Sequence, residues 1–470
     1  MKIQQIYTGC IAQAAYYIEN KGEVALFDPL REVQPYIDKA NLDHAKIKYI
    51  FETHFHADFV SGHLDLAKKT DGKIVFGPTA KPEFEAIIAT DNQEFKVGDY
   101  TIKTIHTPGH TMESTCYLLI DENGKEHGII TGDTLFIGDV GRPDLAQSLV
   151  NELTQEKLAS YLFDSLRNKI MPLSDDLIVY PSHGAGSACG KNMSKETTDT
   201  LGNQKKTNYA LRKNMSREEF TAEVLDGLGI PPAYFPQNVM MNIQGYASLD
   251  SVMDKSKKPL NPAEFKAIAN DMNAIILDVR HENDFVKCHI PRSIFIGIQG
   301  NFAPWVGSLI MNTKQPILLI TPNGMENETI TRLSRVGFDN VLGYLEGGID
   351  SWKTAKFETD SIDSISPEQF SNEFKNDSIV VDARKPSEYD AEHVENAINL
   401  PLDTINSHLG LVPKEDGFYL HCAGGYRSVI MASILKSRGF HHFTNVEKGI
   451  SGIRNTTVPL TVFVCPSTIN

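Results

Sequence analysis

Three short stretches of this chain carry histidines and aspartates at spacings that suit a metal ion. They are THFHAD at 53–58, TPGHTMES at 107–114 and TGDTLFIGDVGRPD at 131–144. A lone histidine is more often a satisfied core or surface residue than a ligand. Here several histidines and an aspartate occur in separate stretches, together with turn-forming glycine and proline. Imidazole and carboxylate are common metal ligands, so the stretches together predict one metal site.

Apolar segments must position these side chains. Up to about residue 190, strand-like runs such as EVALFDP, IKYIFETH and LIVYPSHG alternate with polar turns and helical stretches. This pattern favours a layered α/β sandwich. Four candidate residues each follow the end of such a strand: His54, His110, Asp133 and His183. Sites are commonly assembled from loops at one edge of a rigid sheet, so we expect the four to meet.

A second chemical signal is FYLHCAGGYRSVIMASIL at 418–435. An apolar strand ends at Cys422, a glycine-containing loop follows, and a helix is expected to begin near Ser428. Backbone N–H groups of the loop and the positive end of the helix would stabilise a thiolate or a persulfide on Cys422. Arg427 adds a charge able to bind sulfite or thiosulfate. The same outline also fits a cysteine phosphatase or an inert buried thiol.

Cys189 is a third candidate, in the small-residue loop HGAGSACGKNMS. Most single cysteines behave as small hydrophobic residues. An adjacent ammonium lowers the pKa of a thiol, however, and Lys191 lies close by in the sequence. The sequence therefore leaves open an inert thiol or a redox or persulfide-carrying role.

The second half of the chain contains an internal repeat. IILDVRHENDFVKCHIP at 275–291 matches IVVDARKPSEYDAEHVE at 379–395, with Asp278 and Arg280 in the places of Asp382 and Arg384. Each copy alternates strand, loop and helix, which implies a parallel sheet with covering helices. A polar linker joins the two copies.

The totals bound the possible functions. The chain has 470 residues, long enough for about three domains. A net charge of −15 without a basic run argues against a nucleic-acid or anionic membrane partner. The N-terminus lacks a signal-peptide pattern, and no apolar run is long enough for a transmembrane helix. Six cysteines without disulfide-framework spacing fit a reducing cytoplasm.

The spacing of the three stretches over the first 190 residues resembles the metallo-β-lactamase fold, an αββα sandwich. Within it, TGDTLFIGDVGRPDL and TPGHTMES look most like the persulfide dioxygenase branch. The resemblance implies that His54, His110 and Asp133 bind one Fe(II) per chain. Two imidazoles and one carboxylate on one face leave positions open for O2 and the sulfur of a substrate.

Phe59 departs from the binuclear hydrolases of this fold, in which a histidine at this position binds a second metal. Phenylalanine cannot donate a lone pair, so the resemblance implies a mononuclear site. Three further residues would then orient the ligands or hold water: His56, Asp58 and His183. Arg142 forms either a salt-bridged turn with Asp144 or a contact to the thiol-carrier part of the substrate.

CAGGYRS and the preceding DARKPSEYDAEHVENAINLP resemble the active loop and the upstream pattern of rhodaneses, which favours sulfur transfer by Cys422 over phosphatase chemistry. The loop of the other copy reads TPNGMENE at 321–328, without the cysteine and the arginine, so we expect that copy to be catalytically silent. The expected domains are a metallo-β-lactamase-fold domain with a helical extension at 1–250, a silent rhodanese-like domain at 258–355 and an active rhodanese domain at 363–458.

Together the resemblances imply a dioxygenase that converts a low-molecular-weight thiol persulfide and O2 to sulfite, while Cys422 transfers sulfane sulfur to give thiosulfate. The carrier thiol stays open among glutathione, bacillithiol and coenzyme A, and a homodimer or homotetramer is implied. One alternative is a binuclear zinc thioester hydrolase resembling glyoxalase II with appended rhodanese domains, against which Phe59 argues. Another is a non-catalytic sulfur carrier or sensor, which would not need the metal ligands.

Overall fold

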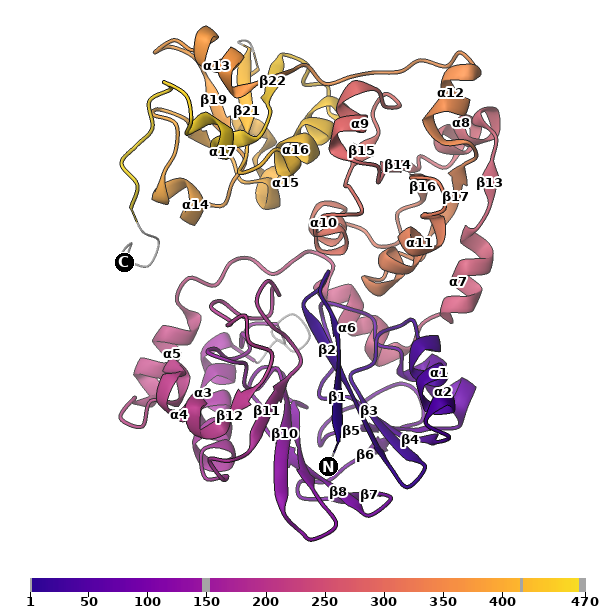
Figure 1. Cartoon of the computed structure of the whole chain (residues 1–470), viewed down its shortest axis with the longest axis vertical. Helices are drawn as coiled ribbons and strands as arrows, with labels where there is room; N and C mark the ends of the chain where they lie inside the picture. The colour runs from indigo at the N-terminus through magenta and orange to yellow at the C-terminus, as the bar shows by residue number, and fades with distance from the viewer. Residues whose placement is uncertain (1, 146–152, 415–416, 465–470) are drawn as a thin grey trace. The chain divides into compact units, whose positions relative to one another are not determined.

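The computed structural model describes residues 2–145, 153–414 and 417–464 of the chain. The chain divides into two compact units. The first comprises residues 1–252 with 333–338, and the second comprises residues 253–332 with 339–470. Each unit is built on two sheets (Figure 1).

The first sheet of the first unit contains six strands in sequence order, β1 to β6. β1, β2 and β3 are antiparallel, and β3 to β6 are parallel. Strand β3, EVALF, is buried after its first residue, as is typical of a strand covered on both faces. The bounds are β1 Ile3–Thr8, β2 Gln13–Asn20, β3 Glu23–Phe27, β4 Lys46–Phe51, β5 Lys73–Phe76 and β6 Ile87–Ile88.

The second sheet has the order β12-β11-β10-β9-β8-β7. Its neighbours are antiparallel except β10 and β11, which are parallel. β10 and β11 therefore end at the same edge, which places Asp133 and His183 near each other. The bounds are β7 Glu94–Val97, β8 Tyr100–His106, β9 Thr115–Ile120, β10 Glu126–Gly132, β11 Ile178–Pro181 and β12 Asp199–Thr200.

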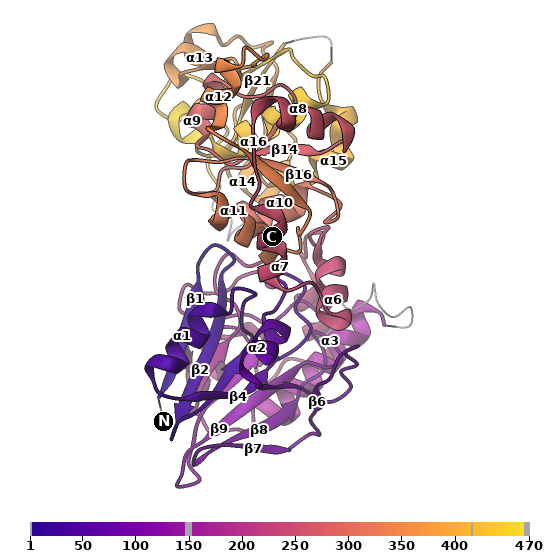
Figure 2. The same ribbon diagram turned by 90° about the vertical axis from the view of Figure 1, so that its right-hand side faces the viewer.

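Helices cover the outer faces of the two sheets, as Figures 1 and 2 show. Apolar side chains fill the space between the sheets. Phe51 stacks on Phe27 with ring centroids 4.8 Å apart and lies 4.9 Å from Tyr117 of the opposite sheet. The expected αββα sandwich is therefore present. The helices are α1 Gln34–Leu42, α2 His63–Thr70, α3 Gln155–Ser165, α4 Leu201–Thr207, α5 Arg217–Leu225, α6 Phe235–Gln244 and α7 Leu249–Ser256.

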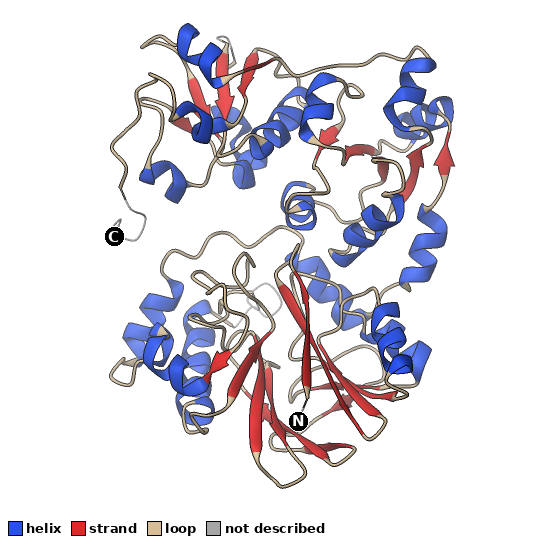
Figure 3. Cartoon of the chain, in the orientation of Figure 1, coloured by secondary structure: helices blue, strands red, loops and turns tan. Residues whose placement is uncertain are grey.

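The second unit contains the two repeats, each with a five-stranded sheet whose neighbouring strands are parallel (Figure 3). Helices begin at sequence-encoded caps, such as the capping boxes at Asn261 and Ser366, each followed by proline. The parallel sheets with covering helices that the repeat predicted are therefore confirmed.

The first repeat contains β13 Pro259–Leu260, α8 Pro262–Asp271, β14 Ile275–Asp278, α9 Glu282–Lys287, β15 Ile294–Phe295, α10 Phe302–Leu309, β16 Ile317–Ile320, α11 Glu326–Arg335, β17 Val341–Leu345 and α12 Gly348–Thr354. The second contains β18 Ser364–Ile365, α13 Pro367–Glu373, β19 Val380–Asp382, α14 Pro386–Ala391, β20 Ile398–Asn399, α15 Ile405–His408, β21 Phe418–His421, α16 Tyr426–Ser437, β22 Phe443–Val446 and α17 Gly449–Ile453.

The helix after Cys422 begins earlier than the sequence predicts. It starts at Tyr426 rather than near Ser428, because Gly425 adopts a φ of +109° that side-chain-bearing residues rarely reach. Among the described residues, no helix has the length and apolar character needed to cross a membrane.

Candidate metal centre and sulfur-transfer loop

Three strand ends bring His54, His110 and Asp133 together. His54 follows β4, His110 follows β8 and Asp133 follows β10. All three are buried, and one ligand atom from each lies within 4.8 Å of the others. Oδ2 of Asp133 is 3.4 Å from Nε2 of His110 and 3.9 Å from Nε2 of His54. We call these residues the first trio.

Hydrogen bonds set the tautomers of the two imidazoles. Oγ1 of Thr53 donates to Asp28 at 2.9 Å, which leaves that oxygen to accept from Nδ1–H of His54 at 3.0 Å. Nδ1–H of His110 donates to the carbonyl of Arg142 at 2.8 Å. In its neutral form each imidazole can therefore present Nε2 as the atom that binds a metal.

The residues expected around the ligands form a second trio: His56, Asp58 and His183. Nε2 of His183 lies 3.5 Å from Oδ2 of Asp58 and 3.5 Å from Oδ1 of Asp133. Asp133 therefore faces the first trio with one oxygen and the second trio with the other. Nε2 of His56 is 3.0 Å from Asp28, which leaves Nδ1 as its other possible ligand atom.

Several buried polar atoms of these trios lack a hydrogen-bond partner within the described residues. They are both carboxylate oxygens of Asp133, Oδ1 of Asp58, Nε2 of His183 and both ring nitrogens of His56, whose Nε2 nevertheless lies beside the Asp28 carboxylate. Burying such atoms without partners costs free energy, which a bound cation would offset. Imidazole and carboxylate donors together fit a transition-metal ion.

Phe59 is fully buried and stacks on the ring of His56, with centroids 4.2 Å apart. Asn242 of α6, which sequence reasoning missed, clamps the loop around it. The Asn242 amide donates to the carbonyls of His56 and Phe59 at 2.8 and 2.9 Å and accepts from Ser61 N–H at 2.9 Å. The only signal was an asparagine in the helical run FPQNVMMNIQ, which alone does not reveal its partner.

The two neighbouring histidines have opposite pKa shifts. Burial and the surrounding imidazoles hold the pKa of His54 well below its ordinary value. Burial also opposes charge on His56, but the carboxylates of Asp28 and Glu52 outweigh it and raise the pKa to about 9. Asp28 and Glu52 were also missed, because aspartate and glutamate after β3 and β4 carry no spacing signal of their own.

Cys189 lies at this centre. Its Sγ is within 4.8 Å of ligand atoms of Asp133 and His183. Of the two influences on its pKa, burial prevails over a nearby ammonium: burial, with the charges of Asp58 and Asp133, raises the pKa well above the usual value. The Lys191 ammonium does not bond the thiol. It donates instead to the carbonyls of Glu223 and Asp226, at 2.6 and 2.7 Å.

Arg142 ties loops together beside the first trio. Its guanidinium bonds both oxygens of Asp144, at 2.6 and 2.7 Å, and also donates to the carbonyls of Ala188 and Gly229 at 3.3 and 2.5 Å. These contacts support the salt-bridged turn of the two alternatives. Its backbone carbonyl also orients His110, as described above.

Cys422 directly follows β21 and is buried. Its Sγ accepts a hydrogen bond from Gly425 N–H at 3.1 Å, and α16 begins at the next residue. The carbonyl of Cys422 accepts from Ile450 N–H at 2.8 Å. The loop thus directs an amide and a helix N-terminus at the sulfur, an environment that favours an anion.

Arg427 is paired rather than free. Its two terminal nitrogens bond both oxygens of Glu388, at 2.6 and 2.7 Å. Burial raises the pKa of Glu388, but these bonds and the charge of Arg427 outweigh it, so the net pKa is lowered. An oxyanion approaching Arg427 must therefore compete with an internal carboxylate, which the sequence did not predict.

The loop of the other copy explains its expected silence. Ile320 pairs with Asp278 in one sheet, and His421 pairs with the equivalent Asp382 in the other. The next residues therefore align, Thr321 with Cys422 and Glu326 with Arg427. Oε1 of Glu326 accepts from Thr321 Oγ1 and from Gly324 N–H, both at 3.2 Å. In this loop a carboxylate therefore accepts from the amide that is equivalent to Gly425 N–H, which donates to Sγ of Cys422 in the other copy.

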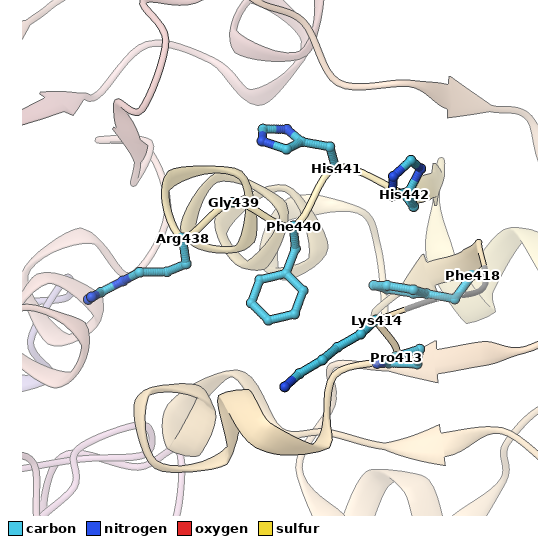
Figure 4. A pocket seen from close by; sticks show the side chains of 8 residues that line it. All are labelled: Pro413, Lys414, Phe418, Arg438, Gly439, Phe440, His441 and His442. Carbon is cyan, nitrogen blue, oxygen red and sulfur yellow. The ribbon is translucent and has the colours of Figure 1, made fainter.

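A pocket of about 230 Å³ in the copy that contains Cys422 lies away from the Cys422 loop (Figure 4). It is lined by Pro413, Lys414, Phe418, Arg438, Gly439, Phe440, His441 and His442. Arg438 follows the C-terminal end of α16, whereas Cys422 precedes the N-terminal end. A helix of that length separates its ends by roughly 18 Å, so this pocket does not hold the reacting sulfur.

Comparison with known proteins identifies two kinds of domain in the chain. The family description "Metallo-beta-lactamase superfamily" matches residues 8–183. A crystal structure of a metallo-beta-lactamase from Staphylococcus aureus subsp. aureus COL shares 31% identity and a TM-score of 0.65, covering 73% of this chain and 99% of that one. This chain belongs to the metallo-β-lactamase superfamily. The description "Rhodanese-like domain" matches residues 261–355 and 366–456, so this superfamily member also carries two rhodanese-like domains.

Other known proteins resemble part of this metallo-β-lactamase superfamily member. A hydroxyacylglutathione hydrolase from Dictyostelium discoideum is 31% identical over 189 residues, 39% of this chain and 66% of that protein. ETHE1 from Myxococcus xanthus is 25% identical with a TM-score of 0.43, covering 52% of this chain and 96% of that one. The chain spans between about half and two thirds of the length of the curated relatives it matches.

Proposed function

We propose that the first unit oxidises the terminal sulfur of a low-molecular-weight thiol persulfide with O2, and that Cys422 transfers sulfane sulfur to the sulfite that forms. In the first reaction RSSH, O2 and water give RSH and sulfurous acid, which ionises to sulfite. In the second, the Cys422 thiolate takes the outer sulfur of RSSH and releases RSH. Sulfite then attacks that sulfur, giving thiosulfate and restoring the thiolate.

The observation that carries the proposal is a combination within one chain. The first trio is buried, and Phe59, which has no lone pair to bind a metal, stacks on His56 beside it. Cys422 lies in a loop whose Gly425 amide donates to the sulfur. A single Fe(II) held by the first trio would supply the redox chemistry that O2 requires. A closed structural zinc site would not.

The chain's own residues have defined tasks. Thr53 and the carbonyl of Arg142 orient His54 and His110, and Asp133 contributes the carboxylate. Cys189 lies beside Asp133, and we assign it the task of meeting the sulfur of the substrate. Phe59 keeps one wall of the site apolar, which limits access of water.

The test is metal analysis of anaerobically purified protein together with O2 uptake on addition of glutathione persulfide. About one iron per chain, with O2 consumption matched by sulfite, supports the proposal. Two zinc ions per chain without O2 uptake would overturn it.

A binuclear thioester hydrolase is a second candidate. The second trio has buried, unsatisfied ligand atoms, and relatives that match 35% and 39% of the chain are named hydroxyacylglutathione hydrolases. Hydrolysis of S-lactoylglutathione by zinc-loaded protein would favour this candidate.

A further inference from the structure

The silent copy touches the active loop of the other copy within the second unit. Tyr426, the first residue of α16, places its ring against the 297–300 loop of the silent copy and donates from Oη to the carbonyl of Gly297 at 2.8 Å. Phe295 lies edge-on to the same ring, with centroids 5.8 Å apart. The tyrosine adjoins Gly425, whose amide binds the sulfur of Cys422.

The 297–300 loop leaves no room for a side chain at its end. A Cβ at Gly300 would come within 2.4 Å of Cζ and 2.5 Å of Oη of Tyr426. A Cβ at Gly297 would meet the same ring at 3.1 Å. The two glycines therefore let the tyrosine ring approach the backbone, which is a requirement of shape rather than of backbone conformation.

The silent copy holds this loop in place. Ile298 N–H donates to the carbonyl of Val279 at 3.0 Å, and Gly300 N–H donates to Gly297 at 3.2 Å. Arg332 of α11 donates to the carbonyl of Ile298 at 2.8 Å. A surface fixed in this way can restrain the residue that packs on it.

From these contacts we propose that the silent copy is a positioning element for sulfur transfer, and that Tyr426 is the positioning residue through which it acts. Fixing Tyr426 fixes the first turn of α16 and so the direction of Gly425 N–H toward the sulfur of Cys422. Hydrogen bonds to a developing anion are effective when their donors are held in advance. The proposal rests on the sulfur-transfer activity proposed above.

A second contact between the copies provides a matched control. Ser433, seven residues farther along α16, accepts from Phe295 N–H at 2.9 Å. It belongs to the same interface but lies about two helical turns from the Cys422 loop. Loss of this bond weakens docking of the copies without releasing the first turn of α16.

The experiment measures the rate at which iodoacetamide alkylates Cys422 in the full-length chain, by mass spectrometry of the Cys422 peptide. Gly300→Ala should slow alkylation by about tenfold, since small misplacements of reacting groups have large effects on rate. Tyr426→Phe, which keeps the ring and loses one hydrogen bond, should slow it less. Ser433→Ala and Gly410→Ala should match wild type, because an added Cβ at Gly410 meets no atom within 4 Å.

Sulfurtransferase kinetics provide the second readout. Gly300→Ala should lower kcat while leaving KM for the sulfur donor unchanged, and thermal unfolding identifies any variant that fails to fold. Unchanged alkylation in both Gly300→Ala and Tyr426→Phe would overturn the proposal, as would an equal loss in Ser433→Ala. If wild type forms no thiosulfate, the proposed function fails, yet the alkylation rates still decide whether the silent copy positions Cys422.

Discussion

The Phe59 ring stacks on the His56 ring with centroids 4.2 Å apart and an angle of 30° between the planes. An apolar side chain thus packs against a residue of the second trio, while that trio keeps unsatisfied ligand atoms. The number of metal ions per chain therefore depends on whether His56, Asp58 and His183 suffice without a ligand from position 59.

Replacing Phe59 with histidine should restore a ligand beside the second trio. We expect Phe59→His to raise the metal content from about one to about two ions per chain, because an imidazole lone pair would complete the set. Phe55→His is the matched control, since Phe55 is a buried phenylalanine of the same loop that packs against Phe76. Metal analysis decides; a wild-type content of two ions would contradict the mononuclear interpretation.

Thr53 links Asp28 to His54, because its hydroxyl donates to the Asp28 carboxylate and accepts from Nδ1–H of His54. Thr53→Val removes the oxygen that accepts from Nδ1–H of His54, so we expect metal affinity to fall by about 10- to 100-fold. Thr104→Val provides the comparison, because the buried Thr104 hydroxyl has no hydrogen-bond partner among the described residues. Competition with a chelator measures both affinities, and equal affinities would show that Thr53 does not orient His54.

Cys422→Ser should separate the two reactions. The serine hydroxyl cannot carry a persulfide, so thiosulfate formation should disappear while sulfite formation and O2 uptake persist. Sulfite and thiosulfate are quantified by chromatography of their bimane derivatives. Loss of both products would contradict the division of labour between the units.

Glu388 should limit the use of anionic sulfur donors. Glu388→Gln removes the carboxylate that occupies Arg427, so we expect KM for thiosulfate as donor to fall by about tenfold. The exposed neighbour Asp390, changed to asparagine, controls for the loss of one negative charge. An equal fall in both variants would assign the effect to net charge instead.

The same ion pair fixes the sign of a pH effect. The pKa of Glu388 is lowered from its ordinary 4.5 in the folded chain. Its contribution to the free energy of unfolding is therefore present above the unfolded pKa and lost as pH falls through the folded value. We expect the thermal midpoint of wild type to exceed that of Glu388→Gln near neutral pH, and the gap to narrow below about pH 4. A gap that widens on acidification would contradict this assignment.

Much of the fold could be predicted from the sequence because it is written in local patterns. The alternation of apolar strands with polar turns predicted the layered α/β sandwich. The internal repeat predicted two parallel sheets. The positions of His54, His110 and Asp133 after strand ends predicted that they meet. Parallel neighbours such as β10 and β11 end at one edge, so strand-end residues converge whatever the loops do.

Side-chain partners chosen over long sequence distances could not be predicted. The sequence determined which groups can bind metal or carry sulfur: imidazoles, carboxylates and the thiols of Cys189 and Cys422. Only the tertiary structure decided that burial raises the pKa of Cys189, that Glu388 pairs with Arg427 and that Tyr426 packs on the 297–300 loop of the first repeat. The sequence shows which side chains can bind metal or carry sulfur. Their pKa values and hydrogen-bond partners depend on residues that folding brings from elsewhere in the chain.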